Sequence, residues 1–286
     1  MGSWRSRLES GVRSLNPGYL ALVMATGIVS KAMDLEGATG LSAVLLVIGI
    51  AAWLVLSYSL PLLLVGRPSA QPALAGANGT WFVWVVGTQS IAVAVTSLHP
   101  PVSQALAALA ICCWAIGVVL YLLIAALVAA DLLTYPVRPA EVGPPYWVFM
   151  GATAISVLAG AQILHLPADP LSTAVHGVVS GLSVVLWAFG TWLIPFLLVV
   201  GAWRHMLRRV PLSYELGWWS IVFPVGMYGV ASRQLGAVLH VSWLVTLGRY
   251  EGWVGLAVWA VVAVAMGASL WRAATGVPAG SPVGRP

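Results

Sequence analysis

Long apolar runs separated by short polar stretches dominate the hydrophobic pattern of this chain. A transmembrane helix needs about 20 apolar residues, and the runs recur at about that length from one end to the other. No stretch between two runs is long enough for a folded soluble domain, so the pattern predicts an all-α polytopic membrane protein with eight transmembrane helices. The predicted helices cover residues 18–34, 41–65, 79–98, 102–130, 145–166, 174–205, 216–235 and 252–272.

The first, third, fifth and seventh runs open in the same way. In each, Gly or Pro and an aromatic residue precede a stretch of small residues, and a second, longer apolar run follows. The repeated unit is therefore a helical hairpin used four times, and such repeats in membrane proteins enclose a transport path. The four openings are Gly18-Tyr19-Leu20-Ala21, Gly79-Thr80-Trp81-Phe82, Pro145-Tyr146-Trp147-Val148 and Gly217-Trp218-Trp219-Ser220.

The two helices of each hairpin differ in polarity. The first carries Gly, Thr, Ser, Gln and Pro, whereas the second is mostly Leu, Val, Ala and Ile. Polar groups in hydrocarbon are costly, so they are expected to face protein or water. We therefore place the odd-numbered helices inside, around a central pore, and the even-numbered helices outside. The alternative is that small and polar residues only allow close helix packing.

Charge supports a membrane protein with a defined orientation. Only 7% of residues are charged and 60% are hydrophobic, which excludes an ordinary soluble domain. The net charge of +5 does not indicate nucleic-acid binding, because the basic residues lie at loop ends and follow the positive-inside rule. We expect a multi-pass plasma-membrane protein with both termini in the cytoplasm. The inner side then holds Arg5, Arg7, Arg13, Arg67, Arg138, Arg204, Arg208, Arg209, Arg272 and Arg285, and the outer side Lys31, Arg233 and Arg249.

The sequence predicts three consecutive segments in the chain. Residues 1–16 place Trp4, Leu8, Val12 and Leu15 on one helical face, which predicts an amphipathic segment lying on the inner membrane surface. Residues 17–273 form the transmembrane transport domain. The Gly- and Pro-containing tail, 274–286, is predicted to be disordered.

Three segments resemble the tellurite-resistance and C4-dicarboxylate transporter family, which includes the plant slow-type anion channels. Asn16-Pro17-Gly18-Tyr19 with Met24-Ala25-Thr26-Gly27-Ile28-Val29-Ser30 resembles the first helix of that family. Pro144-Pro145-Tyr146-Trp147 resembles its fifth, and Trp218-Trp219-Ser220-Ile221-Val222-Phe223-Pro224-Val225-Gly226-Met227-Tyr228 its ninth.

The resemblance implies an anion channel or transporter. Family members form homotrimers in which each protomer has its own pore, lined by the odd-numbered helices. Their substrates include malate and other C4-dicarboxylates, sulfite, chloride, nitrate and tellurite-related anions. A Phe on the ninth helix plugs the pore in the anion-channel branch, and that position falls on Phe223 here. The family pattern has ten helices in five hairpins, so one hairpin is expected to be absent from this chain. Either four inner helices then close a narrower pore, or a neighbouring subunit contributes, or one of the predicted spans contains a reentrant break.

Phe223 is the predicted gate. The residue after it, Pro224, lacks the amide hydrogen that would bond to the Ser220 carbonyl, so a kink is expected there. A bulky ring at a kink can block a pore, and the alternative is a core Phe beside an ordinary membrane proline.

Further predicted site residues lie on the inner helices. Lys31 and Arg233, near the outer ends, are predicted to attract anions, or else to anchor the helices at the interface. Hydroxyls and amides can replace part of the hydration shell of an anion without binding it tightly. The predicted pore-lining residues are Thr26, Ser30, Thr88, Gln89, Thr153, Ser156, Pro224 and Gln234.

Other functions have weaker support. The five histidines give no i, i+3 or i, i+4 pair and no Asp-rich motif occurs, so neither a metal site, a cofactor nor a catalytic residue is predicted. No acidic residue lies in the middle of a predicted inner helix, and Asp34 and Glu251 are expected in outer loops, which favours passive anion flux over a carboxylate proton relay. An exporter or permease for another small metabolite or weak acid is the alternative, and a membrane-embedded enzyme is less favoured.

Overall fold

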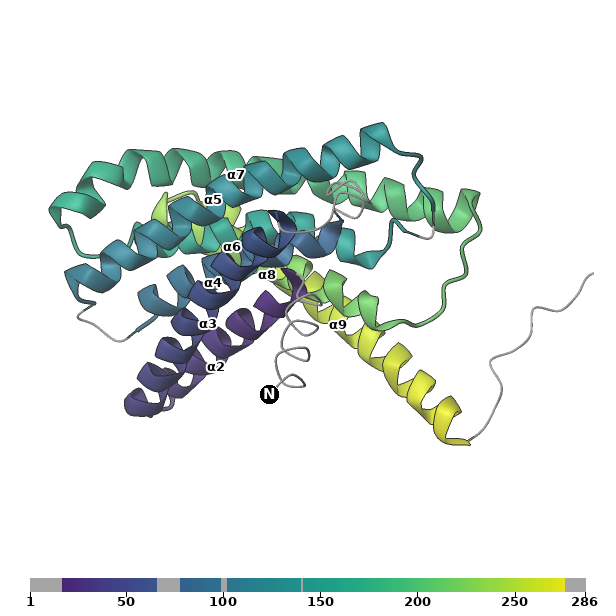
Figure 1. The fold of residues 1–286 in the computed structure, drawn as a ribbon, viewed down its shortest axis with the longest axis horizontal. Helices are drawn as coiled ribbons and strands as arrows, with labels where there is room; N and C mark the ends of the chain where they lie inside the picture. The colour runs from purple at the N-terminus through teal and green to yellow at the C-terminus, as the bar shows by residue number, and fades with distance from the viewer. Residues whose placement is uncertain (1–16, 66–77, 99–101, 140, 276–286) are drawn as a thin grey trace, which may run out of the picture.

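The computed structural model describes residues 17–65, 78–98, 102–139 and 141–275. The predictions for residues 1–16 and for the tail after Thr275 lie outside these ranges. The eight predicted segments correspond to eight long helices (Figure 1), which confirms the all-α fold. They are α2 (Ala21–Leu35), α3 (Thr39–Val65), α4 (Val83–Thr96), α5 (Gln104–Thr134), α6 (Trp147–Ile163), α7 (Pro170–Ala202), α8 (Trp219–Val238) and α9 (Ser242–Thr275).

Most helix boundaries differ from the prediction by a few residues, and the largest difference is at the start of α9. α9 begins at Ser242, well before residue 252, so Glu251 lies within a helix and not in an outer loop. The polar pair Arg249 and Glu251 lowers the local hydrophobicity, and the apolar pattern therefore misplaced the start of this helix. Asp34 also differs from the prediction, because it lies buried in the last turn of α2.

The long segment 174–205 is a single helix, as predicted. α7 begins at Pro170, where the Asp169 carboxylate accepts hydrogen bonds from the amides of Leu171 and Ser172. Such a cap satisfies amide groups that have no partner inside the helix. α7 continues without interruption into a π-helical turn, η4 (Trp203–Leu207).

The fourfold sequence repeat corresponds to a repeated local structure. Each inner helix is preceded by a short 3₁₀ helix that contains the aromatic residue of the repeat, and consecutive 3₁₀ helices contact one another. At Gly79 this contact is so close that a Cβ atom would overlap the backbone of Pro145, which explains the glycine. The four are η1 (Pro17–Leu20), η2 (Gly79–Phe82), η3 (Pro144–Tyr146) and η5 (Leu216–Trp218).

The hairpins pack side by side through their first helices. α2, α4, α6 and α8 form a row in which each packs on the next, and each also packs on the second helix of its own hairpin. The spans of α4 and α6 are 67% and 78% buried, against 22% for α3, which confirms the predicted inner position of these two helices. α2 and α8, at the two ends of the row, share no substantial contact in the described chain, so the row is an open arc.

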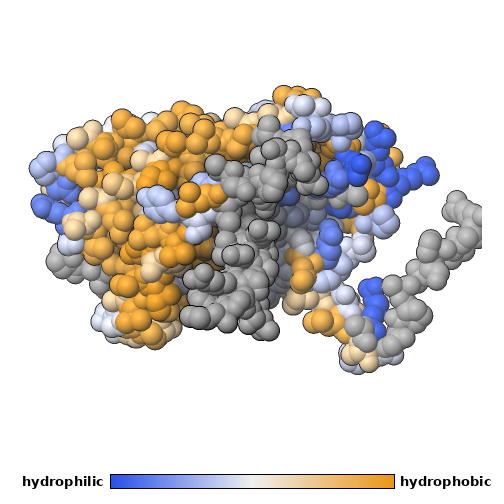
Figure 2. All heavy atoms as spheres, in the orientation of Figure 1, coloured by the Kyte–Doolittle hydropathy of each residue, from blue (hydrophilic) through white to orange (hydrophobic). Residues whose placement is uncertain are grey.

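Length and apolarity together separate the two helices at the ends of the row from the other described helices. Six of the described helices are long and apolar enough to cross a membrane, and the two that fall short are α2 and α8. Figure 2 shows hydrophobic residues over the flank formed by α2 and α3, and hydrophilic residues at the end of the long axis where the segment after η4 lies. The surface is therefore that of a multi-pass membrane protein.

Candidate functional site

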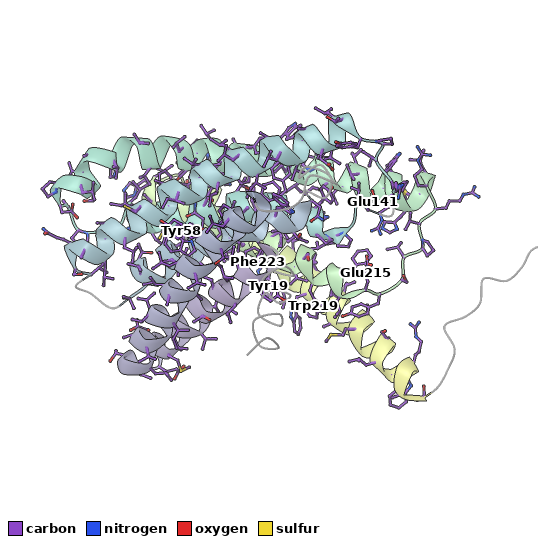
Figure 3. The ribbon with its side chains drawn as sticks, in the orientation of Figure 1. Tyr19, Tyr58, Glu141, Glu215, Trp219 and Phe223 are labelled. Carbon is purple, nitrogen blue, oxygen red and sulfur yellow. The ribbon has the colours of Figure 1, made fainter. Side chains whose placement is uncertain are left out.

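Phe223 and Pro224 lie where α8 meets α6. α8 continues as a helix through Pro224, which is buried, while Phe223 is half-buried. A Cβ atom on Gly151 of α6 would lie 2.8 Å from Pro224 Cγ and 3.1 Å from Phe223 Cε1. The absence of a side chain at Gly151 thus allows the proline turn of α8 to pack directly on α6. Figure 3 shows Phe223 near the middle of the molecule.

The predicted pore residues of α2, together with Thr88 of α4, face α3. The Ser30 hydroxyl donates to the carbonyl oxygen of Ser42 at 2.8 Å, and Trp53 Nε1 donates to Thr88 Oγ1 at 2.9 Å. Thr26 donates to a carbonyl one turn earlier in α2 at 2.8 Å, and its methyl group lies beside a glycine of α3. The Ser30 hydroxyl therefore holds the two helices of the first hairpin together, and among these three residues only Thr88 joins the first hairpin to the second.

The other predicted residues of α4 and α6 lie at interfaces with α5 and α7. Gln89 Nε2 donates to the Trp114 carbonyl oxygen of α5 at 3.2 Å. The Thr153 and Ser156 hydroxyls donate to carbonyls within α6 at 2.6 and 2.7 Å, and Thr153 lies against Gly190 of α7. Such contacts are those of the helix-packing alternative, and the pore-lining role of these residues stays a prediction.

The remaining predicted residues lie towards the C-terminal ends of α2 and α8. Lys31 belongs to α2, but its side chain lies outside what the structure describes. Arg233 is exposed and Gln234 is half-buried. Within the described residues, no predicted pore residue hydrogen-bonds to another across two inner helices.

A polar link between α7 and α8 was not predicted. Trp187 Nε1 donates to Ser232 Oγ at 2.8 Å, and the Thr191 and Tyr228 hydroxyl oxygens lie 2.7 Å apart. Both pairs are spaced by one helical turn on their helices, so they form two rungs between the same faces. The i, i+4 spacing of polar and aromatic residues was the signal available in the sequence.

A cavity of about 660 Å³ was also not predicted. It lies between α6, α7, α8 and α9, and its walls are mainly aliphatic and aromatic. Arg204, expected only to set membrane orientation, lines it together with Glu251. Arg204 is buried, and its Nη2 atom lies 3.9 Å from Glu215 Oε1. Figure 3 shows Glu215 and Glu141 towards the same end of the molecule.

No metal centre emerges from the described part of the chain. Within it, no group of three or more His, Cys, Asp or Glu side chains is placed to hold a metal ion.

Four helical hairpins with a row of inner helices define an all-α multi-pass membrane protein. Residues 36–267 match the family of voltage-dependent anion channels, and the chain belongs to that family. This confirms the resemblance found in the sequence, and the general function is that of a membrane anion channel or transporter.

Several relatives are similar to parts of the chain. An uncharacterized membrane protein of Mycobacterium tuberculosis strain H37Rv is 53% identical over 147 residues, which cover 51% of this chain and 75% of the relative. Two uncharacterized transporters of Methanocaldococcus jannaschii are 21% and 23% identical, over 65% and 55% of this chain and 54% and 46% of the relatives. No solved structure matches the chain.

Proposed function

We propose that the protein carries small anions along the row of inner helices and that Phe223 closes the path. The observation that carries the proposal is the half-buried ring of Phe223 beside Pro224, in a chain that belongs to an anion-channel family. The proposed substrates are small anions, namely C4-dicarboxylates such as malate, or the inorganic anions sulfite, chloride and nitrate.

The proposed flux is passive and driven by the membrane potential. In the described inner helices the only acidic residue is Asp34, at the end of α2, so a chain of buried carboxylates for proton coupling has no support. Neutral hydroxyl and amide groups suit conduction, because an anion must leave each site as readily as it enters.

We further propose a homotrimer in the plasma membrane with both termini in the cytoplasm. The positive-inside rule supports this orientation, since the described residues Arg138, Arg208, Arg209 and Arg272 fall on the proposed inner side. In a trimer, a neighbouring subunit can cover the open arc between α2 and α8.

Anion flux through purified protein in liposomes tests the proposed gate. Wild type and Phe223→Ala are compared for chloride, nitrate, sulfite and malate, with Phe196→Ala as the control. Phe196 is an exposed Phe on the outer helix α7, so its removal leaves any inner path unchanged. We expect faster flux only in Phe223→Ala. Equal flux in all three proteins would contradict the gate, and no flux of any of these anions would contradict the anion pathway.

A further inference from the structure

The walls of the cavity include α7 and α9, which are both candidate membrane-crossing helices. Both helices are long and apolar enough to span a bilayer, and in the described chain their backbones are not closely packed, although the Trp187 and Trp243 rings meet edge-on. Leu197 and Leu198 of α7 and Val258 and Val261 of α9 are among the residues that line the cavity. What adjoins such an apolar cavity in a membrane is hydrocarbon.

One end of the cavity holds a buried cation. The side chain of Arg204 lines the cavity with only 10% of its surface exposed, and its Nε has no hydrogen-bond partner among the described residues. Its ion-pair partner, Glu215, lies 3.9 Å from Nη2, beyond hydrogen-bond distance, and is half exposed. A buried guanidinium with an unpaired donor is costly unless an anion pairs with it. The charge at this end therefore suits an anionic group.

The length of the cavity suits an acyl chain. Residues of α9 from Glu251 to Val262 line it, and at a helical rise of 1.5 Å per residue this stretch measures roughly 16 Å. One leaflet of the hydrocarbon core is about 15 Å thick. A small hydrophilic anion would pair with Arg204 but leave the long apolar part of the cavity empty.

We propose that this cavity binds an anionic phospholipid, with the phosphate at Arg204 and one acyl chain between α7 and α9. Two more basic residues, Arg208 and Arg209, are exposed just beyond Arg204, and such clusters attract anionic headgroups. The site is separate from the proposed anion path. Ile221 and Val225 line the cavity, whereas Phe223, two residues from each, lies on the opposite face of α8.

Native mass spectrometry of the delipidated protein in detergent tests the site. The probes are phosphatidylglycerol and phosphatidylcholine with the same acyl chains. We expect one tightly held phosphatidylglycerol per chain, bound at least tenfold more tightly than phosphatidylcholine. Arg204→Gln removes the buried charge that would pair with the phosphate and should reduce that preference at least several-fold, because only the exposed Arg208 and Arg209 then remain to attract the headgroup.

A second variant blocks the apolar part without changing any charge. Gly201 of α7 lines the cavity, and a Cβ atom there meets nothing within 4 Å, so Gly201→Leu projects into open space. We expect it to weaken both lipids at least tenfold. Gly181→Leu is the matched control, since Gly181 is on the same helix with equally open surroundings but does not line the cavity. This comparison tests whether lipid occupies the apolar part of the cavity, even if Arg204→Gln does not fold.

Several results would overturn the proposal. One is an unchanged headgroup preference in a folded Arg204→Gln variant, and another is equal lipid binding by the two leucine variants. Displacement of phosphatidylglycerol by equimolar inorganic phosphate would assign Arg204 to a small anion, and equally tight binding of palmitate would assign the site to free fatty acids. A loss of oligomeric mass in Gly201→Leu with unchanged lipid binding would show that a second copy of the chain fills the cavity.

Discussion

Trp187 Nε1 donates a hydrogen bond to Ser232 Oγ at 2.8 Å, joining α7 to α8 across two hairpins. The indole ring of Trp187 also stacks on Tyr228 of α8, with ring centroids 6.4 Å apart, and packs edge-on against Trp243 of α9. One side chain thus connects the third hairpin to both helices of the fourth.

Trp187→Phe should therefore destabilise the protein modestly. The substitution keeps an aromatic ring but removes the indole donor, and hydrogen bonds between membrane helices contribute about 0.6 kcal/mol on average and up to about 1.7. We expect a loss within that range, measured by reversible unfolding in mixed micelles. Trp192→Phe is the control, because Trp192 is exposed on the same helix and makes no described hydrogen bond. Equal losses in both variants would contradict a role for the link.

Gly248 of α9 is expected to be intolerant even of alanine. A Cβ atom there would lie 2.5 Å from both the Arg233 amide nitrogen and the Gly229 carbonyl oxygen of α8. Since both neighbours are backbone atoms, the two helices must move apart, and overpacking of this kind costs about 1–3 kcal/mol. Gly267→Ala, in the same helix, meets nothing within 4 Å and serves as the control in the same unfolding measurement. Equal stability of the two alanine variants would contradict the close α8–α9 packing.

The contact between repeat openings gives a third prediction. In Gly79→Ala, the new Cβ would lie 2.6 Å from the Tyr146 Cα atom, so η2 and η3 must separate, again at a cost of about 1–3 kcal/mol. Gly217 is the corresponding glycine of the fourth repeat, and a Cβ atom there meets Pro145 Cδ at an ordinary 3.7 Å. We expect thermal aggregation at a lower temperature for Gly79→Ala only. The opposite order would mean that the repeats do not contact one another as described.

The hydrophobic pattern predicted the fold well because membrane helices must satisfy their backbone hydrogen bonds internally. Length and apolarity therefore locate six of the described helices, and the aromatic openings marked the hairpin repeat to which α2 and α8 belong. The start of α9 was misplaced because Arg249 and Glu251 interrupt the pattern, although a polar pair can be accommodated within a helix where it borders a cavity, as Glu251 does.

The sequence did not show in which direction each polar side chain of an inner helix points. Thr88 and Gln89 are adjacent in α4, yet the first bonds to Trp53 of α3 and the second to Trp114 of α5. Polarity marks α4 as an inner helix but does not distinguish a group that faces a path from one that ties helices together. The sequence also did not show that Arg204 is buried, because its burial depends on how α7 and α9 diverge around the cavity.

Gly151→Ala gives the last prediction, which concerns the proposed gate. A Cβ atom there would press on Pro224 and on the Phe223 ring at 2.8 and 3.1 Å, so the ring must move while its chemistry is unchanged. We expect anion flux in liposomes to differ from wild type several-fold, in the direction of the Phe223→Ala variant if the ring is displaced from the path.

The control for this variant is Gly181→Ala on the outer helix α7, where a Cβ atom meets nothing within 4 Å. The double variant Gly151→Ala with Phe223→Ala separates the gate from a general loss of structure. If the glycine acts through the ring, the double variant conducts like Phe223→Ala alone, because effects on one contact are not additive. Additive effects in the double variant would instead mean that Gly151 influences flux without Phe223, and the ring would no longer be the element that closes the path.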